Sequence, residues 1–285
     1  MIRQKSFSNE MPTLYLVPTP IGNLEEMSPR AIEILRSVDI IAAEDTRNTM
    51  KLLQVYDIHT RLIAHHSHNE RESAKGLLNL LEQGHSIAVV SDAGYPLISD
   101  PGQNIVEQVT AAGYNVVPVS GCSASINALV ASGLKAQPFL FKGFLASNDR
   151  ECVRELESLK KLPFTMIFYE APHRIERMLG HCLDVLGDRR ACLAREMTKK
   201  HEEFIRGTLS EIKEIAGDLK GEMVIVIEGC QEKEEQAVDM TQITSRINER
   251  INLGMSASEA IKQIAKESGV SKNEIYRIYH QESQN

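Results

Sequence analysis

The chain has 285 residues, of which 42% are hydrophobic and 25% are charged, and its formal net charge is −7. That length exceeds the size at which a single hydrophobic core usually stops growing, so we expect two domains. The acidic balance argues against a protein that coats naked nucleic acid, because such proteins usually carry a basic excess. A local basic cleft can still operate within an acidic chain, so a specific nucleic-acid substrate remains open.

Features of secreted and membrane proteins are not found in the sequence. No run of 18 apolar residues predicts a membrane span, and the first dozen residues, MIRQKSFSNEMP, have no apolar core of a secretory signal. The five cysteines are odd in number and show no CxxC spacing, which predicts reduced thiols and a cytoplasmic protein.

The first part of the chain alternates strand-like and helix-like segments. Strands are predicted at 13–17, 40–43, 86–91 and 115–119, and helices at 29–37, 47–54, 102–112 and 124–132. Ser28-Pro29 is a typical helix start, with a capping hydroxyl before proline at the first helical position, and Asp100-Pro101 is similar. Continuous apolar strands such as IAVVS favour a parallel sheet covered on both faces. We therefore predict an α/β domain over residues 13–135.

After residue 135 the pattern restarts, and it predicts a second α+β domain with a mixed sheet over 136–230. The predicted strands are 139–144, 164–169, 191–195 and 223–228; the predicted helices are 149–160 and 172–186; and 201–208 is predicted as a hairpin return into a capped helix at 208–216. A charged linker at 231–240 follows.

The last segment, 241–285, is predicted to form a small helical domain. SASEAIKQIAKESGVSKNEIYRIYH predicts a helix, a turn at Ser268-Gly269 and a second helix, which is typical either of a helix-turn-helix or of a helical appendage. Six Lys or Arg face five Glu from Met240 onward, so the charge does not favour DNA binding.

Polar stretches follow several predicted strands, where open α/β sheets build their sites. They are the opening loop at 18–24, AEDTR at 43–47, SDAGYPLISDPG at 91–102 and SGCSA at 120–124. In the second domain FYEAPHR and REMTKKHEE hold similar positions, although solvated charges and capped turns would give the same composition.

The opening loop, VPTPIGNLEEMS, has the position of a phosphate-binding loop without its chemistry. A phosphate site needs several backbone N–H donors, and Pro18 and Pro20 remove two of them. Only Gly22 is available for a tight turn, and no Lys follows as in a Walker motif. The loop therefore favours a neutral or cationic ligand such as a sulfonium.

Three histidines in HHSHNE, at positions 65, 66 and 68, invite a metal interpretation. The loop has neither the i, i+4 spacing of a helical zinc site nor a cysteine, and Asn69 resembles a helix cap. We predict a polar loop that faces substrate, with no metal.

Taken in order, VPTPIGNLEEMS, AEDTR, HSHNE, SDAGYPLISDPG, SGCSA, FYEAPHR and REMTKKHEEFIRG resemble the ribosomal RNA small subunit methyltransferase I family. That family belongs to the tetrapyrrole (precorrin) methylase superfamily, and the resemblance runs from about Thr13 to Glu228, with a similar helical tail. It implies two α/β domains, S-adenosylmethionine as methyl donor with S-adenosylhomocysteine as product, and a cytidine ribose 2′-hydroxyl in the decoding region of 16S rRNA as acceptor. It also implies a cytoplasmic homodimer that acts on the small ribosomal subunit, without a membrane or DNA partner.

The resemblance also implies roles for individual residues. Cofactor binding is implied for Pro18, Gly22, Ser91, Asp92, Ala93, Gly94, Ile98, Ser123, Ala124, Tyr169 and Met197. Asp92-Ala93-Gly94 replaces the Asp-Pro of tetrapyrrole enzymes and Glu170 replaces their Met, and both departures favour the RNA branch.

A ribose hydroxyl is a weak nucleophile, so a nearby base would help methyl transfer. The candidate catalytic carboxylates are Glu44, Asp45, Glu170 and Glu196, and the candidate RNA-binding residues are Arg47, His68, Arg174, Arg195, Lys199 and Lys200. Two alternatives remain open at this point: a tetrapyrrole C-methyltransferase, and a ligand-sensing DNA-binding protein.

Overall fold

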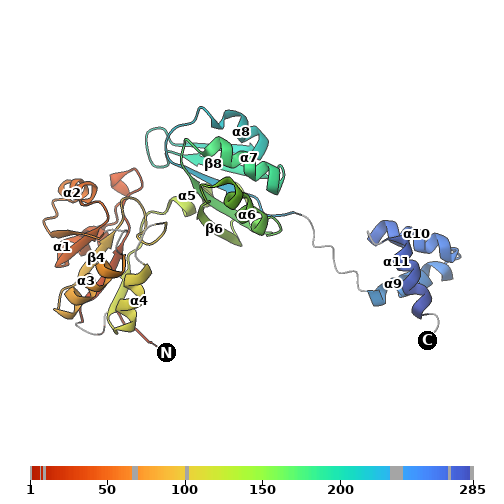
Figure 1. The fold of residues 1–285 in the computed structure, drawn as a ribbon, viewed down its shortest axis with the longest axis horizontal. Helices are drawn as coiled ribbons and strands as arrows, with labels where there is room; N and C mark the ends of the chain where they lie inside the picture. Colours follow the sequence, from red (N-terminus) through yellow and green to blue (C-terminus); the bar gives the residue numbers. More distant parts are fainter. Residues whose placement is uncertain are drawn as a thin grey trace. The chain divides into compact units, whose positions relative to one another are not determined.

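A computed structural model describes residues 2–6, 8, 11–65, 70–99, 103–231, 240–268 and 271–282 (Figure 1). The chain divides into two compact units, Met1–Cys230 and Gln231–Asn285. Two five-stranded sheets lie in the first unit, and the second unit is helical. The predicted architecture, two α/β layers followed by a helical tail, is confirmed.

The first sheet is parallel throughout and has the strand order β3-β2-β4-β1-β5. Its strands are β1 (Thr13–Val17), β2 (Ile40–Ala43), β3 (Arg61–Ala64), β4 (Ile87–Val90) and β5 (Asn115–Pro118). The sequence pattern predicted four of these strands and missed β3. That strand lies at the edge of the sheet, and its half-exposed RLIA run has too little apolar character to stand out.

Two pairs of helices cover the faces of this sheet. They are α1 (Pro29–Ser37) and α2 (Thr46–Val55) on one face, and α3 (Glu70–Glu82) and α4 (Gln103–Ala111) on the other, with a short 3-10 turn η1 (Leu24–Glu26) before α1. Strand residues alternate between the two faces, as the pleat requires: Ile41 packs under α1 and α2, and its neighbour Ile40 packs under α3 and α4. The predicted start of α1 is confirmed, because the Ser28 hydroxyl accepts a hydrogen bond from Ala31 N at 3.2 Å.

The second sheet is mixed, with the order β6-β7-β10-β8-β9; β6 and β7 are parallel and the other neighbours are antiparallel. Its strands are β6 (Phe139–Phe144), β7 (Thr165–Glu170), β8 (Arg190–Arg195), β9 (Glu203–Thr208) and β10 (Met223–Ile227). The helices α6 (Asp149–Leu159), α7 (Ile175–Leu186) and α8 (Leu209–Ala216) cover one face.

The other face of the second sheet is covered by a helix from the first part of the chain. In α5 (Ala124–Ala131), Ala128 and Leu129 pack on Ile167, Cys192 and Val226 of the second sheet. Ile21 of the opening loop and Met197 of the β8–β9 turn belong to the same apolar cluster. This shared core joins the two α/β layers into one unit and fixes the position of their facing loops.

The helical unit consists of α9 (Met240–Asn252), α10 (Ala257–Ser268) and α11 (Lys272–Glu282). Buried isoleucines at 243, 247, 261, 264 and 275 form a core of its own. Across the described ranges no helix combines the length and the apolar character that crossing a membrane requires. All five cysteines are free thiols.

Candidate active site

The first sheet has a topological switch point between β1 and β4. These strands are neighbours, yet β1 leads into α1 on one face and β4 leads toward α4 on the opposite face. Crevices that bind ligands open at such points, beyond the carboxyl ends of the strands. The loop after β1 contains the opening PTPIG segment, and the loop after β4 contains SDAGYPLIS, so both predicted stretches meet at this edge.

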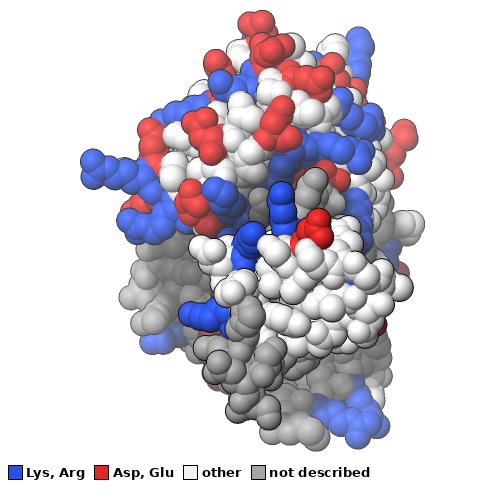
Figure 2. Space-filling model, turned by 90° about the vertical axis from the view of Figure 1, so that its right-hand side faces the viewer, with Lys and Arg blue, Asp and Glu red and all other residues white. Residues whose placement is uncertain are grey.

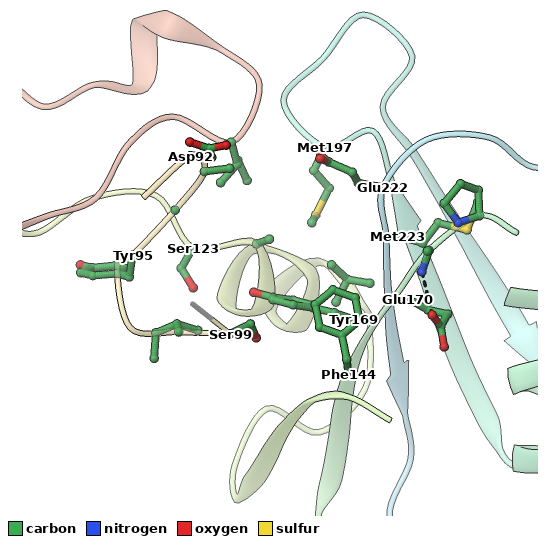
Figure 3. Close-up of a pocket in the computed structure, with 18 residues that line it drawn as sticks. Asp92, Tyr95, Ser99, Ser123, Phe144, Tyr169, Glu170, Met197, Glu222 and Met223 are labelled. Carbon is green, nitrogen blue, oxygen red and sulfur yellow. Dashed lines mark hydrogen bonds between the residues drawn. The ribbon is translucent and has the colours of Figure 1, made fainter. Parts of the chain in front are cut away.

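A cavity of about 380 Å³ opens at this edge, between the loops of the first sheet and the end of the second (Figure 3). That volume lies within the usual range for small-molecule sites. It is lined by Ile21, Asp92, Ala93, Gly94, Tyr95, Ile98, Ser99, Ser123, Ala124, Phe144, Tyr169, Glu170, Ala171, Pro172, Met197, Glu222, Met223 and Val224.

Eight of the residues proposed for cofactor binding line this cavity. They are Asp92, Ala93, Gly94, Ile98, Ser123, Ala124, Tyr169 and Met197. Figure 3 shows Asp92, Tyr95 and Ser123 on the side of the first sheet, across the cavity from Tyr169, Met197 and Met223. The structure therefore brings together, from both domains, most of the residues for which the resemblance implied this role.

The lining combines acidic and apolar groups. Among the described residues that form it, three are carboxylates (Asp92, Glu170 and Glu222) and none is Lys or Arg. Phe144 and Tyr169 pack edge to face with ring centroids 5.6 Å apart, at one end of the cavity (Figure 3). Such a lining suits a cation with an aromatic part and disfavours a phosphate.

The sequence did not indicate the lining residues Phe144, Glu222, Met223 and Val224; the last three lie at the start of β10 or just before it. Because β10 runs antiparallel to β7 and β8, Met223 pairs with Glu170 on one side and Arg195 on the other, at the ends of both strands. A search limited to the residues after strands overlooks this position. The GEMVIVI run predicts a strand, but the pattern does not show in which direction the strand runs in the sheet. Its first residues could therefore not be placed at the cavity from the sequence.

The opening loop crosses the mouth of the crevice and is tied to the loop after β4. Thr19 N donates to Gly94 O at 2.9 Å, and Gly94 N donates to Thr19 O at 3.0 Å. The Thr19 amide is thus already satisfied, in keeping with a loop that has few donors for phosphate. Pro18 and Ser91 lie behind the cavity lining: Pro18 packs against Gly121, and the Ser91 hydroxyl donates to Gly94 O at 2.8 Å.

The turn after β8 is held by ion pairs in an unusual conformation. Glu196 and Thr198 have positive φ angles of 49° and 67°, and Met197 between them reaches the cavity. Lys199 Nζ donates to Glu196 Oε1 and to Glu222 Oε2, both at 3.1 Å. The hydrogen bond from Lys199 holds the pKa of Glu196 below its usual value.

Glu170 and Arg174 form a buried pair beside the cavity. The Glu170 side chain is fully buried, and its Oε1 lies 3.3 Å from Arg174 Nε and accepts from Ala171 N at 2.8 Å. Arg174 Nη2 donates to the carbonyl oxygens of Leu145 and Ala146. Both residues are therefore bonded within the protein, at the point where the β6 and β7 loops meet.

The remaining predicted residues lie at varied positions. Asp45 caps α2 and pairs with exposed Arg47 at 3.1 Å, and that hydrogen bond lowers the pKa of Asp45. Glu44 is half-buried just after β2 and is not among the residues that line this cavity. Arg195 pairs with Glu203 at 2.5 Å, Lys200 is exposed, and His68 lies outside the described residues.

A second cavity of about 290 Å³ adjoins the first on the side of α2. It is lined by Thr19, Pro20, Gly22, Leu24, Asn48, Thr49, Lys51, Leu52, Val55, Ser91 and Asp92. Asp92 lines both cavities, and Asn48 Nδ2 donates to Asp92 Oδ2 at 3.1 Å. Gly22 and Ser91, two of the residues proposed for cofactor binding, line this second cavity.

Comparisons with known proteins agree with this fold. The sequence model of the family described as Tetrapyrrole (Corrin/Porphyrin) Methylases matches residues 13–213. Two solved structures share the fold: cobalt precorrin-4 methyltransferase, with a TM-score of 0.58 and 14% identity over 76% of this chain and 94% of that one, and a Thermus thermophilus uroporphyrin-III C-methyltransferase complexed with S-adenosyl homocysteine, with a TM-score of 0.54 and 18% identity over 76% and 97%.

Two bacterial proteins are similar over nearly the whole chain, and both are named Ribosomal RNA small subunit methyltransferase I. The protein of Bacillus subtilis (strain 168) is 48% identical over 286 residues, which cover 98% of each chain. That of Halalkalibacterium halodurans is 46% identical over 275 residues, which cover 95% of each. From this identity, together with the matching family model and fold, we conclude that the chain belongs to the ribosomal RNA small subunit methyltransferase I family of the tetrapyrrole methylases.

Proposed function

We propose that the protein transfers the methyl group of S-adenosylmethionine to the ribose 2′-oxygen of a cytidine in the decoding region of 16S rRNA. The observation that carries this proposal is the cavity at the switch point of the first sheet. The relatives that are similar over nearly the whole chain are named as methyltransferases of ribosomal RNA of the small subunit. S-adenosylhomocysteine is the expected product. We further propose that the protein acts in the cytoplasm as a homodimer.

The character of the cavity supports S-adenosylmethionine as the ligand. Asp92, which forms no ion pair within the described ranges, can complement a positive sulfonium or amino group, and no Lys or Arg is found among the described lining residues. Tyr169, Phe144 and Met197 offer apolar surface to an adenine ring. A pyrophosphate-bearing nucleotide would meet the Asp92 carboxylate and would find no Lys or Arg among the described lining residues. A similarly folded solved structure is titled as a complex with S-adenosyl homocysteine.

The chain's main contribution to the reaction is alignment. When bound, S-adenosylmethionine supplies an electrophilic methyl group that a ribose oxygen can attack in line. Holding two reactants at near-attack distance contributes on the order of 7–11 kcal/mol to lowering a barrier. The shared core around α5 supports such precision, because it fixes the loops of both sheets relative to each other.

The test uses small ribosomal subunits from cells that lack this protein. Purified wild-type protein is mixed with these subunits and S-adenosylmethionine labelled with tritium in its methyl group, and the labelled nucleotide is mapped by its resistance to alkaline hydrolysis. We expect about one methyl group per subunit, on the 2′-oxygen of a decoding-region cytidine. Label on a base of 16S rRNA instead of a ribose would overturn the proposal, and so would label on another RNA or on an added tetrapyrrole while 16S rRNA stays unlabelled.

A further inference from the structure

The opening loop and Asp92 lie between the second cavity and the first. Within the opening loop, Ile21 lines the first cavity, and its neighbours Pro20 and Gly22 line the second. Asp92 borders both, and Figure 3 shows it at the edge of the first cavity. One loop and one carboxylate thus divide two adjoining spaces.

A nucleotide that receives a methyl group must lie next to the space that holds the donor. The second cavity meets this condition, because it shares Asp92 with the first. A third cavity, beside α1 and lined by Pro29, Ile32, Glu33, Arg36 and Ser37, has no residue in common with the first. Its position gives it no access to the donor.

The chemistry of the second cavity suits a ribonucleotide. Leu24 and Val55, with exposed fractions of 44% and 59%, present apolar surface at its rim. Thr19, Asn48 and Thr49 add polar groups, and Lys51 adds a cation. A base can pack on the apolar surface while the sugar edge meets the polar groups.

Lys51 differs from most of the cations that the sequence indicated for RNA binding. Arg47, Arg174, Arg195 and Lys199 are each paired with a carboxylate of the protein. Within the described ranges Lys51 forms no ion pair, and its side chain is exposed on α2. It can therefore bind a phosphate without first breaking an internal bond.

We propose that the second cavity is the acceptor subsite, in which one ribonucleotide of the RNA substrate binds with a neighbouring phosphate on Lys51 and its 2′-hydroxyl on Asp92. This inference rests on the proposed function. It adds where the RNA nucleotide that receives the methyl group binds and which residues bind it. Asn48, through its hydrogen bond to Asp92 Oδ2, is a positioning residue that orients the carboxylate.

The transfer step at this site balances as a simple displacement. The ribose 2′-oxygen forms a bond to the methyl carbon as the carbon–sulfur bond breaks, and the electron pair of that bond remains on sulfur. Asp92 accepts the hydroxyl proton and passes it to solvent, which its exposed position permits. General bases of this kind contribute about 10²- to 10⁴-fold to rates.

RNA binding without the methyl donor tests the subsite. We expect Lys51→Ala to weaken binding of unmethylated small subunits by roughly tenfold, and to lower the slope of log affinity against log salt by about one. S-adenosylmethionine affinity, measured by calorimetry, should stay at the wild-type value. Lys75→Ala is the matched control, because Lys75 is an exposed lysine on α3, on the opposite face of the sheet.

Asp92→Asn tests whether the Asp92 carboxylate takes up the hydroxyl proton. The amide oxygen of asparagine can still accept the hydrogen bond from Asn48, but the amide cannot take up a proton. At saturating RNA and donor we expect at least a roughly 100-fold slower transfer, with RNA affinity within about threefold of wild type. Asn48→Ala, which leaves the carboxylate in place, should slow transfer less, through kcat rather than through the affinity for RNA.

The two proposals fail in different ways. If the wild-type protein methylates 16S rRNA but Lys51→Ala matches Lys75→Ala in RNA affinity and salt slope, the acceptor lies elsewhere and the subsite is wrong. Wild-type rates for Asp92→Asn would remove the carboxylate from the step. If the wild-type protein leaves 16S rRNA unlabelled, the proposed function itself falls.

Discussion

Arg174, Arg195 and Lys199 each bond to a carboxylate of their own chain, so their charges are already used within the fold. Glu170 and Glu196, two of the proposed catalytic groups, are the carboxylate partners of Arg174 and Lys199. The sequence showed clusters of cations and carboxylates at strand ends, and it could not show that they neutralise one another. At the scale of single residues, these pairs hold the cavity walls in place.

The buried pair of Glu170 and Arg174 should be important for stability. Removing one member leaves an uncompensated buried charge, which usually costs about 3–5 kcal/mol. We expect Arg174→Met to lower the free energy of unfolding by that amount in urea denaturation. Arg190→Met is the control: Arg190 pairs with Glu228 at 3.7 Å but is 65% exposed, so its loss should cost about 1 kcal/mol or less. Equal losses in the two variants would contradict this account.

The pair of Glu196 and Lys199 should give a pH-dependent contribution to stability. Because Lys199 lowers the pKa of Glu196 in the folded state, the contribution is complete above the ordinary pKa of about 4.3 and is lost as the pH falls through the folded value. Glu196→Gln should therefore be less stable than wild type at pH 7, by on the order of 1 kcal/mol or less. The difference should shrink below about pH 4; a difference that persists there would exclude the ion pair as its cause.

At the scale of elements, the sequence predicted most helices and strands because their signals are local. The Ser28-Pro29 cap and the continuous apolar IAVV run are signals that a few neighbouring residues carry on their own. The edge strand β3 was missed, and α7 begins at Ile175 rather than at Pro172, because these boundaries depend on tertiary neighbours. The direction of β10 and the packing of α5 on the second sheet are likewise long-range facts, and both help to form the cavity.

The contact between the opening loop and the β8–β9 turn should control cofactor binding. A Cβ at Gly22 would lie 2.6 Å from Lys199 Cγ and 2.8 Å from Thr198 Oγ1, too close for either atom to stay in place. Gly22→Ala should therefore displace the turn that carries Met197 and weaken S-adenosylmethionine binding several-fold in calorimetry.

Gly76→Ala serves as the control for this change. Gly76 lies within α3 with open space around it, so alanine there should raise the free energy of unfolding by about 0.5–1 kcal/mol and leave the cofactor affinity unchanged. Wild-type affinity in Gly22→Ala would show that the two loops do not need this close approach.

At the scale of the whole molecule, the chain has an acidic excess, with a net charge of −7. Figure 2 shows Lys and Arg interspersed with Asp and Glu over the upper part of the face that it presents. A substrate framed by a folded ribosomal subunit suits such a surface better than naked RNA, because local contacts can then provide what a broad basic field would otherwise supply.

The helical tail should be dispensable for the fold of the α/β unit. Its isoleucine core is separate from the apolar clusters of residues 13–230. We expect a protein shortened to residues 1–231 to unfold in urea with the midpoint of the α/β unit in the full chain, and to bind S-adenosylmethionine with unchanged affinity. Precipitation of this protein, or loss of cofactor binding, would show that the tail completes the fold.

Mapping of 2′-O-methyl groups in 16S rRNA from cells that lack this protein tests the central claim most directly. The account predicts that one decoding-region cytidine loses its methyl group, and that the wild-type gene restores it on reintroduction. The gene encoding Asp92→Asn should fail to restore it while the protein is made at the normal level. An intact methyl group at every decoding-region cytidine in those cells would contradict the account.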